Sequence, residues 1–356
     1  MILGAGVGSR LDPLTRSLPK PLVPIVGKPV MGHLLDLLAR HGIKDVMVNV
    51  SYLGHKIQEQ IGDGSAYGVR VSYSVEQELC GDAGGVKRVE AFFRNLDAPD
   101  EPFLVLGGDD LTDTDLSRLI AFHKDKGATA TLAVTPVDDP SEYGIVVLDD
   151  ENGGRVTRFQ EKPKPGEAFS NMANTGIYCF HPKVFDYIPA GTFFGFGNNV
   201  FPALMNAGEI VAGLPSNAYW KDVGNLAIYR QAQRDCMDGK CNVLFPVPKL
   251  GNFSIWRGED FRYGVAGNNS GHAHSPPVVI GNNCYVGDKA QVREYSVLSD
   301  GCTVEEGAMV VNSILWPGAV VKAGTHLENC VVGEGVTVQS SHAIFNGLIV
   351  EARRPA

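Results

Sequence analysis

The sequence has little positive charge, no long hydrophobic run and no pattern of paired cysteines. Its 40 acidic residues outnumber 31 basic ones, and the formal net charge of −9 disfavours a nucleic-acid polymer as partner, because binding a phosphate backbone requires a basic surface. No segment approaches the roughly 20 consecutive apolar residues of a membrane span, and the first residues lack the layout of a signal peptide. We therefore expect a cytoplasmic protein that binds neither membranes nor nucleic acid. A few local cations could still hold a small anion.

The seven cysteines are odd in number and scattered, and no two form a C-x-x-C pair. This spacing predicts neither a disulfide framework nor a zinc site. Most of the cysteines are expected to be small core residues.

Residues 1–235 alternate short apolar runs with amphipathic segments. Strands are expected near 46–50, 69–73, 103–106 and 130–134, and helices near 30–41 and 115–126. This alternation predicts an α/β domain with a Rossmann-like, mostly parallel sheet and helices on both faces. Ligands of such sheets bind beyond the carboxyl ends of the strands.

A chain of 356 residues is too long for one ordinary core, and a second pattern follows the first. Residues 236–277 have little periodicity and are expected to be a connector. Beyond them, apolar residues recur in steps of six, with one step of five, at Ile280, Val286, Val292, Leu298, Val304, Val310, Leu315, Val321 and Leu327. This repeat predicts a left-handed parallel β-helix over residues 278–345 and a tail at 346–356. A β-sandwich fits less well, because its strands recur at roughly 8–12 residues.

Alternate glycines follow a short strand at the start of the chain, in the segment Gly4-Ala5-Gly6-Val7-Gly8. Backbone N–H groups of such a loop can approach a polyphosphate closely. Four prolines between residues 13 and 24 exclude the long helix that opens a dinucleotide fold. A Walker A loop is excluded as well, since Pro29 follows Gly27-Lys28. The loop instead leads into a proline-braced segment with two cations, Arg10 and Lys20.

The string GAGVGSRLDPLTRSLPKPLVPIVGKP resembles the signature of sugar-1-phosphate nucleotidylyltransferases, G-G-x-G-[ST]-R-L-x-P-L-T followed by P-K-P. The resemblance continues in the family's order through YSVEQELCGDAGGVKR, VLGGDDLTD, YGIVV, FQEKP, NTGIYCF, VFPAL and YWKDVG. With the repeat at the C-terminus, the chain is most similar to the mannose-1-phosphate guanylyltransferase branch. The resemblance implies synthesis of a nucleotide sugar and pyrophosphate from a nucleoside triphosphate and a sugar 1-phosphate.

The resemblance also implies a role for residues within these motifs. Catalysis is assigned to Arg10, Lys20 and Asp109, and Mg²⁺ to Asp109 and Asp222. Nucleotide contacts are assigned to Leu3, Gly4, Ala5, Gly6, Gly8, Ser9, Arg10, Lys20, Glu76, Gly81 and Gly84. Contacts to the sugar phosphate are assigned to Gly144, Glu161, Lys162 and Asn174. The acidic run that begins at Glu76 could accept hydrogen bonds from guanine N1 and N2.

Some features leave alternatives open. Asp110 and Asp113 are rivals of Asp109 for the metal, or belong to a capped turn before a helix. Asp82 departs from the Ser or Thr that is usual in the family's base loop, and Gly4-Ala5-Gly6 departs from its Ala-Gly-Gly.

The function has alternatives too. They are a glucose-1-phosphate nucleotidyltransferase that uses UTP, dTTP or ATP, a non-catalytic nucleotide-sugar-binding regulator, and an acyltransferase using His326 or His342. The β-helix is expected to serve association or regulation, with Trp316-Pro317 as a candidate interface feature, and the protein is expected to form a homo-oligomer.

Overall fold

The computed structural model describes residues 1–94, 101–149, 151, 153–250, 255–263, 274–275 and 277–351. The chain divides into two compact units. Unit 1 comprises Met1–Val7, Pro19–Pro21 and Leu34–Asp222, and unit 2 comprises Gly8–Leu18, Leu22–His33 and Val223–Ala356. Parts of the predicted connector and tail lie outside the described residues. In the part of the chain that is described, no helix has the length and apolar character needed to cross a membrane.

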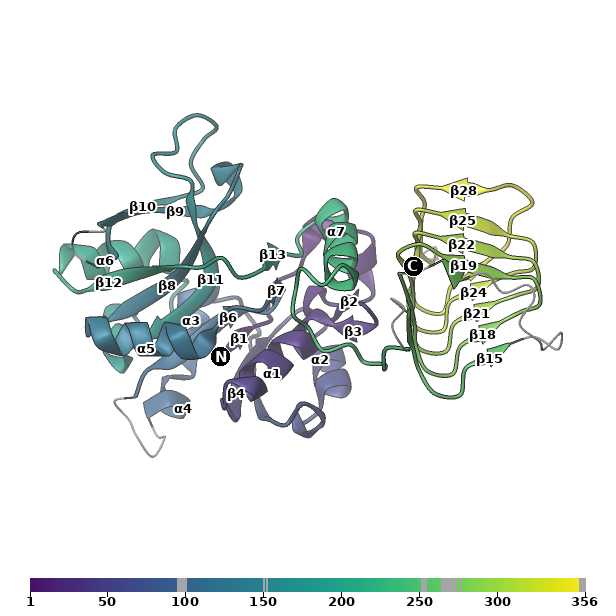
Figure 1. The fold of residues 1–356 in the computed structure, drawn as a ribbon. Helices are drawn as coiled ribbons and strands as arrows, with labels where there is room; N and C mark the ends of the chain where they lie inside the picture. Colours follow the sequence, from purple (N-terminus) through teal and green to yellow (C-terminus); the bar gives the residue numbers. More distant parts are fainter. Residues whose placement is uncertain are drawn as a thin grey trace. The chain divides into compact units, whose positions relative to one another are not determined.

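A nine-stranded sheet forms the centre of unit 1 (Figure 1). In spatial order its strands are β5 (Arg70–Val75), β4 (Asp45–Val50), β1 (Ile2–Leu3), β6 (Phe103–Gly107), β11 (Met172–Phe180), β8 (Ala130–Pro136), β12 (Val211–Pro215), β10 (Arg155–Glu161) and β9 (Gly144–Asp149). The first four strands are parallel to one another. Numbered by their order along the chain, these four follow the 3-2-1-4 arrangement of a Rossmann-like fold. The predicted α/β class is confirmed.

The other half of the sheet is mixed, which corrects the expectation of a mostly parallel sheet. β11 runs antiparallel to β6, β8 and β9, and β10 runs antiparallel to β9 and β12. Among the described residues no helix lies between β9, β10 and β11, and a parallel pair needs such a crossover. Since β9 pairs with both β10 and β11, the pairings among β11, β8, β12, β10 and β9 form a closed ring.

The predicted helices near 30–41 and 115–126 are observed as α1 and α5, and the four predicted strands are β4, β5, β6 and β8. The α-helices are α1 (Val30–Arg40), α2 (Gly54–Ile61), α3 (Gly81–Arg88), α4 (Glu90–Arg94), α5 (Leu116–Lys126), α6 (Phe201–Asn206) and α7 (Leu226–Met237). α5 follows an N-cap at Asp115, whose carboxylate accepts from the Arg118 N–H at 2.9 Å. It ends before Gly127, which adopts the left-handed conformation of a C-cap.

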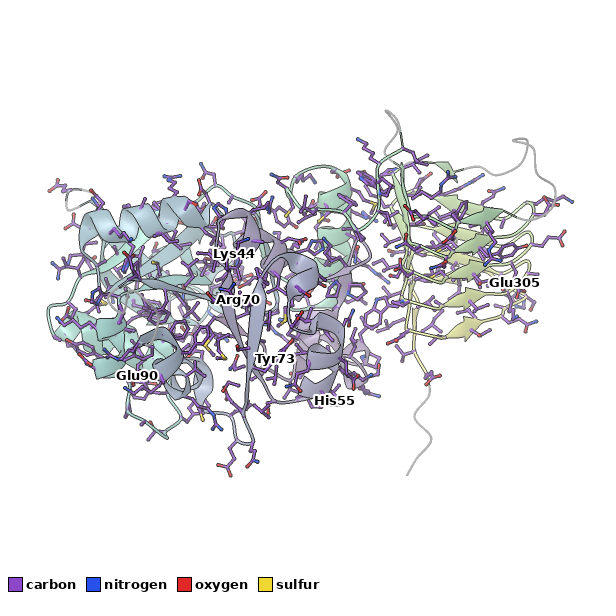
Figure 2. The ribbon with its side chains drawn as sticks, turned by 90° about the horizontal axis from the view of Figure 1, so that it is seen from below. Lys44, His55, Arg70, Tyr73, Glu90 and Glu305 are labelled. Carbon is purple, nitrogen blue, oxygen red and sulfur yellow. The ribbon has the colours of Figure 1, made fainter. Side chains whose placement is uncertain are left out.

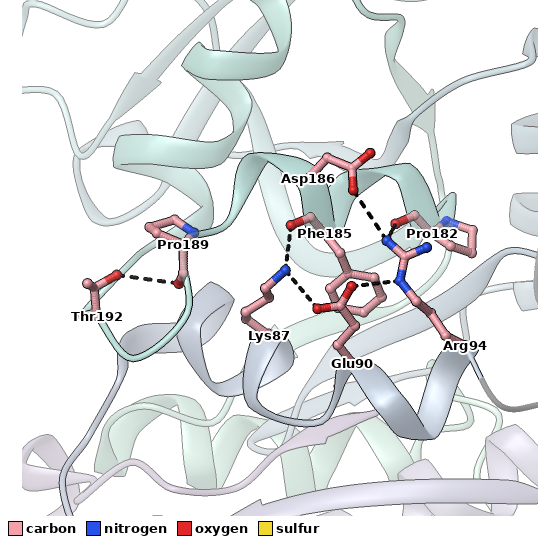
Figure 3. Close-up of polar contacts among 8 residues, drawn as sticks. All are labelled: Lys87, Glu90, Arg94, Pro182, Phe185, Asp186, Pro189 and Thr192. Atoms are coloured by element: carbon pink, nitrogen blue, oxygen red, sulfur yellow. Dashed lines mark hydrogen bonds and ion pairs between the residues drawn. The ribbon is translucent and has the colours of Figure 1, made fainter.

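α3 is fixed at its C-terminal end by the cluster in Figure 3. The Lys87 ammonium donates to the Phe185 carbonyl at 2.8 Å and pairs with Glu90 at 2.7 Å. Arg94 of α4 pairs with Glu90 at 2.6 Å and with Asp186 at 3.3 Å. These contacts fasten α3 and α4 to the 3₁₀ helix η6 (Pro182–Tyr187).

β5 is an edge strand of the sheet, and polar side chains protect it. Arg70 forms two hydrogen bonds with Asp45 of β4, at 2.7 and 2.8 Å, and the Tyr73 hydroxyl donates to the Gly62 carbonyl at 2.7 Å. Figure 2 labels Arg70 and Tyr73 on this strand. Charged side chains on an edge strand discourage pairing with another chain.

Glu209 joins three segments of unit 1 and provides a test of the fold's pH dependence. Its carboxylate pairs with Lys183 at 2.6 Å and accepts from the hydroxyls of Thr129 at 2.7 Å and Tyr187 at 2.8 Å. These contacts, that with Lys183 above all, lower the pKa of Glu209 to about 2. A lowered pKa stabilises the fold while the carboxylate is ionised, and this contribution disappears as the pH falls through the folded-state value.

Glu209→Gln is therefore expected to lower the free energy of unfolding at pH 7. The difference from wild type should shrink as the pH falls from about 4.5 towards 2. Urea unfolding between pH 7 and pH 3 measures this difference. A deficit that is the same at every pH would contradict the account.

Unit 2 contains the predicted parallel β-helix, whose strands stack as rungs in Figure 1. One sheet contains β14 (Ile255–Arg257), β17 (Val278–Ile280), β20 (Ser296–Leu298), β23 (Ile314–Leu315), β26 (Val331–Val332) and β29 (Leu348–Ile349). The second contains β15 (Arg262–Tyr263), β18 (Tyr285–Val286), β21 (Thr303–Val304), β24 (Val320–Val321) and β27 (Thr337–Val338). The third contains β16 (His274–Ser275), β19 (Gln291–Arg293), β22 (Met309–Val311), β25 (His326–Glu328) and β28 (Ile344–Phe345). The repeat works as expected, because Val286, Val304 and Val321 are register partners and fully buried.

The segment predicted as a connector supplies the first rung of the β-helix. β14 pairs with β17, β15 with β18 and β16 with β19, all in parallel. The six-residue spacing of apolar residues is absent in this segment, so the repeat pattern did not reveal the first rung. Six of the seven cysteines are buried, as expected of core residues.

Trp316 is part of the internal packing of unit 2, which corrects its expected place at an exposed interface. The side chain is 1% exposed, and its indole N–H donates to the Tyr229 hydroxyl of α7 at 2.9 Å. That hydroxyl donates in turn to the Pro24 carbonyl at 2.9 Å. Pro24 belongs to the hairpin of β2 (Pro24–Ile25) and β3 (Lys28–Pro29), so the hairpin, α7 and the β-helix share one set of hydrogen bonds.

Candidate active site

The candidate active site lies beyond the carboxyl ends of β1 and β6, where the order of the parallel strands reverses. Ligands of Rossmann-like sheets bind at this point. The Gly108 N–H, just after β6, donates to the Leu3 carbonyl at 2.9 Å. A Cβ at Gly108 would lie 2.5 Å from that carbonyl oxygen, so only glycine allows the two strand ends to approach this closely. Asp109 follows directly.

Lys20 bridges the two aspartates that the sequence assigns to the metal. Its ammonium donates to Asp109 Oδ2 and, at 2.7 Å, to Asp222 Oδ1. The lysine side chain is 8% exposed, against 34% for Asp109 and 22% for Asp222. Burial by itself would lower the pKa of Lys20, but the two carboxylates outweigh burial and raise it. The ammonium therefore stays charged, and three predicted site residues lie together.

A two-stranded ribbon brings Asp222 to this position. β7 (Asp110–Thr112) pairs antiparallel with β13 (Trp220–Asp222), with Asp222 opposite Asp110. The Trp220 indole N–H donates to Asp110 Oδ1 at 3.2 Å.

Asp110, which the sequence left as a rival of Asp109 for the metal, lies in the same ribbon opposite Asp222. It is 4% exposed, and burial, followed by the charges of Asp109 and Asp222, holds its pKa well above the ordinary value. Asp110 begins strand β7, and the helix that follows is capped by Asp115, so Asp110 is not a helix cap. Asp113, the other rival, accepts from the Tyr219 N–H at 2.8 Å. The doubled aspartate of VLGGDDLTD was the available signal.

Glu161 is the last residue of β10, and Lys162 follows it. Glu161 pairs in register with Gly144 of β9, and a Cβ at Gly144 would lie 2.9 Å from Glu161 Oε2. A Cβ at Gly197 would come even closer to the same oxygen, so the carboxylate packs against two glycines that leave room for it. Burial raises the pKa of Glu161, against the opposing effect of Lys162. Lys162 is exposed and has a positive φ of 43°, a strained conformation for lysine that is often found at functional sites.

Asn174 lies in β11, although a turn was its alternative. Its amide donates to the Tyr178 hydroxyl at 2.8 Å, and its carbonyl oxygen accepts from the Gly176 N–H at 3.1 Å. The register of β11 against β8 shifts between Asn174 and Tyr178. At this irregularity a Cβ on Gly176 would lie 3.3 Å from Asp110 Oδ2. The segment therefore adjoins the carboxylate cluster, which comprises Asp109, Asp110 and Asp222.

An aromatic contact joins the carboxylate cluster to the predicted sugar-phosphate residues. The rings of Tyr143 and Trp220 meet edge to face, with 5.3 Å between centroids. The Tyr143 carbonyl accepts from the Lys162 N–H at 3.0 Å. Trp220 and Tyr143 thus connect Asp110 with Lys162 through direct contacts, within unit 1.

The glycine loop, residues 4–7, leaves β1 at the same edge of the sheet. The Gly4 N–H donates to the Asn49 carbonyl at 3.2 Å and to Asn49 Oδ1 at 2.9 Å. A Cβ on Gly6 would meet no atom within 4 Å, so the loop has free space there. The nucleotide contacts of Leu3, Gly4, Ala5 and Gly6 stay predictions.

Gly8, Ser9 and Arg10 belong to unit 2. Gly8 has the left-handed conformation, with φ of 70°, and precedes the 3₁₀ helix η1 (Ser9–Leu11). The Thr15 hydroxyl donates to the Gly8 carbonyl at 2.9 Å. The contribution of Arg10 to catalysis stays a prediction, as do the nucleotide contacts of all three residues.

The base loop, residues 81–85, begins α3 and packs tightly on another segment of unit 1. The Gly84 N–H donates to the Phe194 carbonyl at 3.1 Å. A Cβ at Gly81 would lie 2.4 Å from that carbonyl oxygen. Asp82, the departure from the family motif, accepts from the Phe196 N–H at 2.8 Å. Asp82 therefore ties the base loop to Phe196, whose neighbour Gly197 packs against Glu161.

Glu76, which was predicted to contact the nucleotide, is buried inside unit 1. It is 2% exposed. Its Oε1 accepts from the Asn49 amide at 2.7 Å and its Oε2 from the Cys80 N–H at 3.2 Å. Both Glu76 oxygens are engaged inside the protein, which argues against a contact of Glu76 with guanine, whereas a contact from the exposed residues 77 and 78 of the same run stays a prediction. The partner, Asn49, lies on another strand and could not be identified from the acidic run alone.

The donor set fits a hard divalent cation. Mg²⁺ takes one or two carboxylates together with substrate phosphates and water, and Asp109 and Asp222 both reach the position of one ammonium group. Within the described residues, no group of three or more His, Cys, Asp and Glu side chains forms a larger metal cluster.

Known proteins share this architecture. A sequence model described as Nucleotidyl transferase matches residues 1–239, and one described as GMPPB C-terminal domain matches residues 271–354. The chain is 36% identical over 339 residues to a UTP--glucose-1-phosphate uridylyltransferase of Synechocystis sp., a match that covers 92% of this chain and 85% of the relative. It is 33% identical over 311 residues to a mannose-1-phosphate guanylyltransferase of Mycobacterium tuberculosis, covering 87% and 82%. The solved structure of HddC from Yersinia pseudotuberculosis complexed with GMP-PN has a TM-score of 0.56 at 25% identity, covering 66% and 97%.

Proposed function

Because this chain belongs to the nucleotidyl transferase family, we propose that it transfers a nucleoside monophosphate from a nucleoside triphosphate to a sugar 1-phosphate. The products are a nucleotide sugar and pyrophosphate. The observation that carries the proposal is the meeting of Lys20 with Asp109 and Asp222. Contacts through Trp220 and Tyr143 connect this cluster to the Glu161-Lys162 pair.

The reaction is an in-line attack by a phosphate oxygen of the sugar 1-phosphate on the α-phosphorus of the triphosphate. The bond to the β-phosphate oxygen breaks, and pyrophosphate leaves. No covalent enzyme intermediate is required, so catalysis consists of positioning the two polyanions and neutralising their charge. Lys162 holds the attacking phosphate. Glu161 and Asn174 form hydrogen bonds with the sugar, which lies beside the backbone of Gly144.

Lys20 neutralises the triphosphate, and Arg10 the departing pyrophosphate. A divalent cation held by Asp109 and Asp222, when bound, supplies further positive charge at the phosphates. The glycine loop and the base loop hold the two ends of the nucleotide.

The substrate pair we propose is GTP with mannose 1-phosphate. The match of residues 271–354 to the GMPPB C-terminal domain favours it. UTP with glucose 1-phosphate is the second candidate, favoured by the uridylyltransferase relative. A panel of GTP, UTP, dTTP and ATP crossed with mannose and glucose 1-phosphate, monitored for pyrophosphate, tests both.

The same panel tests the regulatory alternative, which requires that nucleotide sugars bind while no pair releases pyrophosphate. Acetyl-CoA binding would instead support the acyltransferase alternative. The proposed homo-oligomer is tested by the mass of the native particle in light scattering.

A further inference from the structure

We propose that Asn49 and Glu76 are positioning residues that hold the glycine loop and the base loop at a fixed separation and thereby set the affinity for the nucleotide. The inference rests on the proposed function, in which one loop contacts the polyphosphate and the other the base. Neither residue needs to touch the nucleotide.

An unbroken series of hydrogen bonds runs from one loop to the other. The Gly4 N–H, at the start of the glycine loop, donates to Asn49 Oδ1 at 2.9 Å. The Asn49 amide donates to Glu76 Oε1 at 2.7 Å, and Glu76 Oε2 accepts at 3.2 Å from the N–H of Cys80, the residue directly before the base loop. The Glu76 N–H also donates to the Val50 carbonyl at 2.8 Å, which fixes the glutamate to β4.

Burial makes this connection stiff. Asn49 is 3% exposed and Glu76 is 2% exposed. Helix α3 lies directly on the pair, because a Cβ at Gly85 would be 2.7 Å from Glu76 Oε1 and 3.0 Å from Asn49 Nδ2. A buried carboxylate is stable only where N–H groups satisfy its oxygens, so Glu76 holds Asn49 and Cys80 in one arrangement.

The consequence for binding follows from preorganisation. A nucleotide that spans both loops loses affinity when the loops must be ordered on binding. α3 is anchored independently at its other end, where Lys87 donates to the Phe185 carbonyl. Loss of the Asn49–Glu76 contact would therefore uncouple the base-loop end of α3 from the glycine loop, while the hydrogen bonds of this end to Phe194 and Phe196 and the anchor at Lys87 stay in place.

The test compares nucleotide affinities of three variants of the full chain by calorimetry with GTP and with UTP. Asn49→Ala removes the connection, and Asn49→Asp sets two carboxylates against each other. Each is expected to weaken nucleotide binding about tenfold or more. In Asn49→Asp/Glu76→Gln the new carboxylate at position 49 accepts from the Gly4 N–H and from the new amide at position 76. The oxygen of that amide still accepts from the Cys80 N–H, so affinity should return to within about threefold of wild type.

The matched control is Lys87→Met, which removes a partly buried hydrogen bond at the opposite end of the same helix. It should lower the thermal midpoint without weakening nucleotide binding. In the Asn49 variants the KM for the nucleotide should rise more than the KM for the sugar 1-phosphate, a split that general destabilisation would not produce.

Single variants that bind nucleotide within twofold of wild type, or a double variant as weak as the singles, would overturn the inference. Equal weakening by Lys87→Met would overturn it as well. If the wild type binds nucleotide but no sugar 1-phosphate yields pyrophosphate, the proposed function fails while the affinities still decide the inference. If the wild type binds neither nucleotide, both fail.

Discussion

Lys20→Ala is expected to lower kcat by about 10²–10³-fold, the usual cost of removing one preorganised charged group from an active site. The lysine is almost fully buried between Asp109 and Asp222, so its ammonium is held in place before any substrate arrives. Its loss leaves two carboxylates facing the phosphates with no lysine charge between them. The measurement is pyrophosphate release at saturating substrates, together with circular dichroism to establish that the variant is folded.

Lys221→Ala is the matched control for that variant. Lys221 adjoins Asp222 on β13 but is exposed, so it tests whether any nearby positive charge suffices. Its kcat should stay within about twofold of wild type, since exposed charges are screened. Near-normal turnover by Lys20→Ala would remove Lys20 from the mechanism.

Local patterns in the sequence were enough to predict much of the fold. β4, β6 and β8 are buried apolar runs, and the six-residue repeat exposes its architecture because each rung must bury the same side chains. The antiparallel direction of β11 was not predictable, because β11 pairs with β6, β8 and β9. Pairing between strands that are distant in the sequence leaves no local pattern. The first rung of the β-helix was missed because β14 and β15 lack the repeat.

The candidate site was also predicted only where a local motif marks its residues. Lys20, Asp109 and Asp222 were found because the family motifs mark them, and the structure places them together. Asp110 was named only as a rival of Asp109, because two adjacent aspartates do not reveal that one of them is buried and bonded to Trp220. Glu76 was assigned to the base because it begins an acidic run. Its actual partner, Asn49, lies in β4 and could not be identified from that run. Residues that act through tertiary contacts leave no local trace in one sequence.

Asp109→Asn is expected to lower kcat by about 10²-fold or more and to raise the Mg²⁺ concentration needed for half-maximal rate. The amide keeps the size of the carboxylate and one oxygen that can accept from Lys20, so the fold should persist. It removes the negative charge that a hard cation requires. Two measurements decide the prediction, namely the dependence of rate on Mg²⁺ and the binding of Mn²⁺ followed by electron paramagnetic resonance.

Asp113→Asn separates this effect from a general loss of negative charge near the site. Asp113 accepts from the Tyr219 N–H at 2.8 Å, and an asparagine oxygen can accept the same hydrogen bond. Its kcat and Mg²⁺ dependence should stay close to those of wild type. If Asp109→Asn left the Mg²⁺ dependence unchanged, or Asp113→Asn altered it equally, the metal would not be held by Asp109. The charge on Lys20 would then balance Asp109 for structural reasons alone.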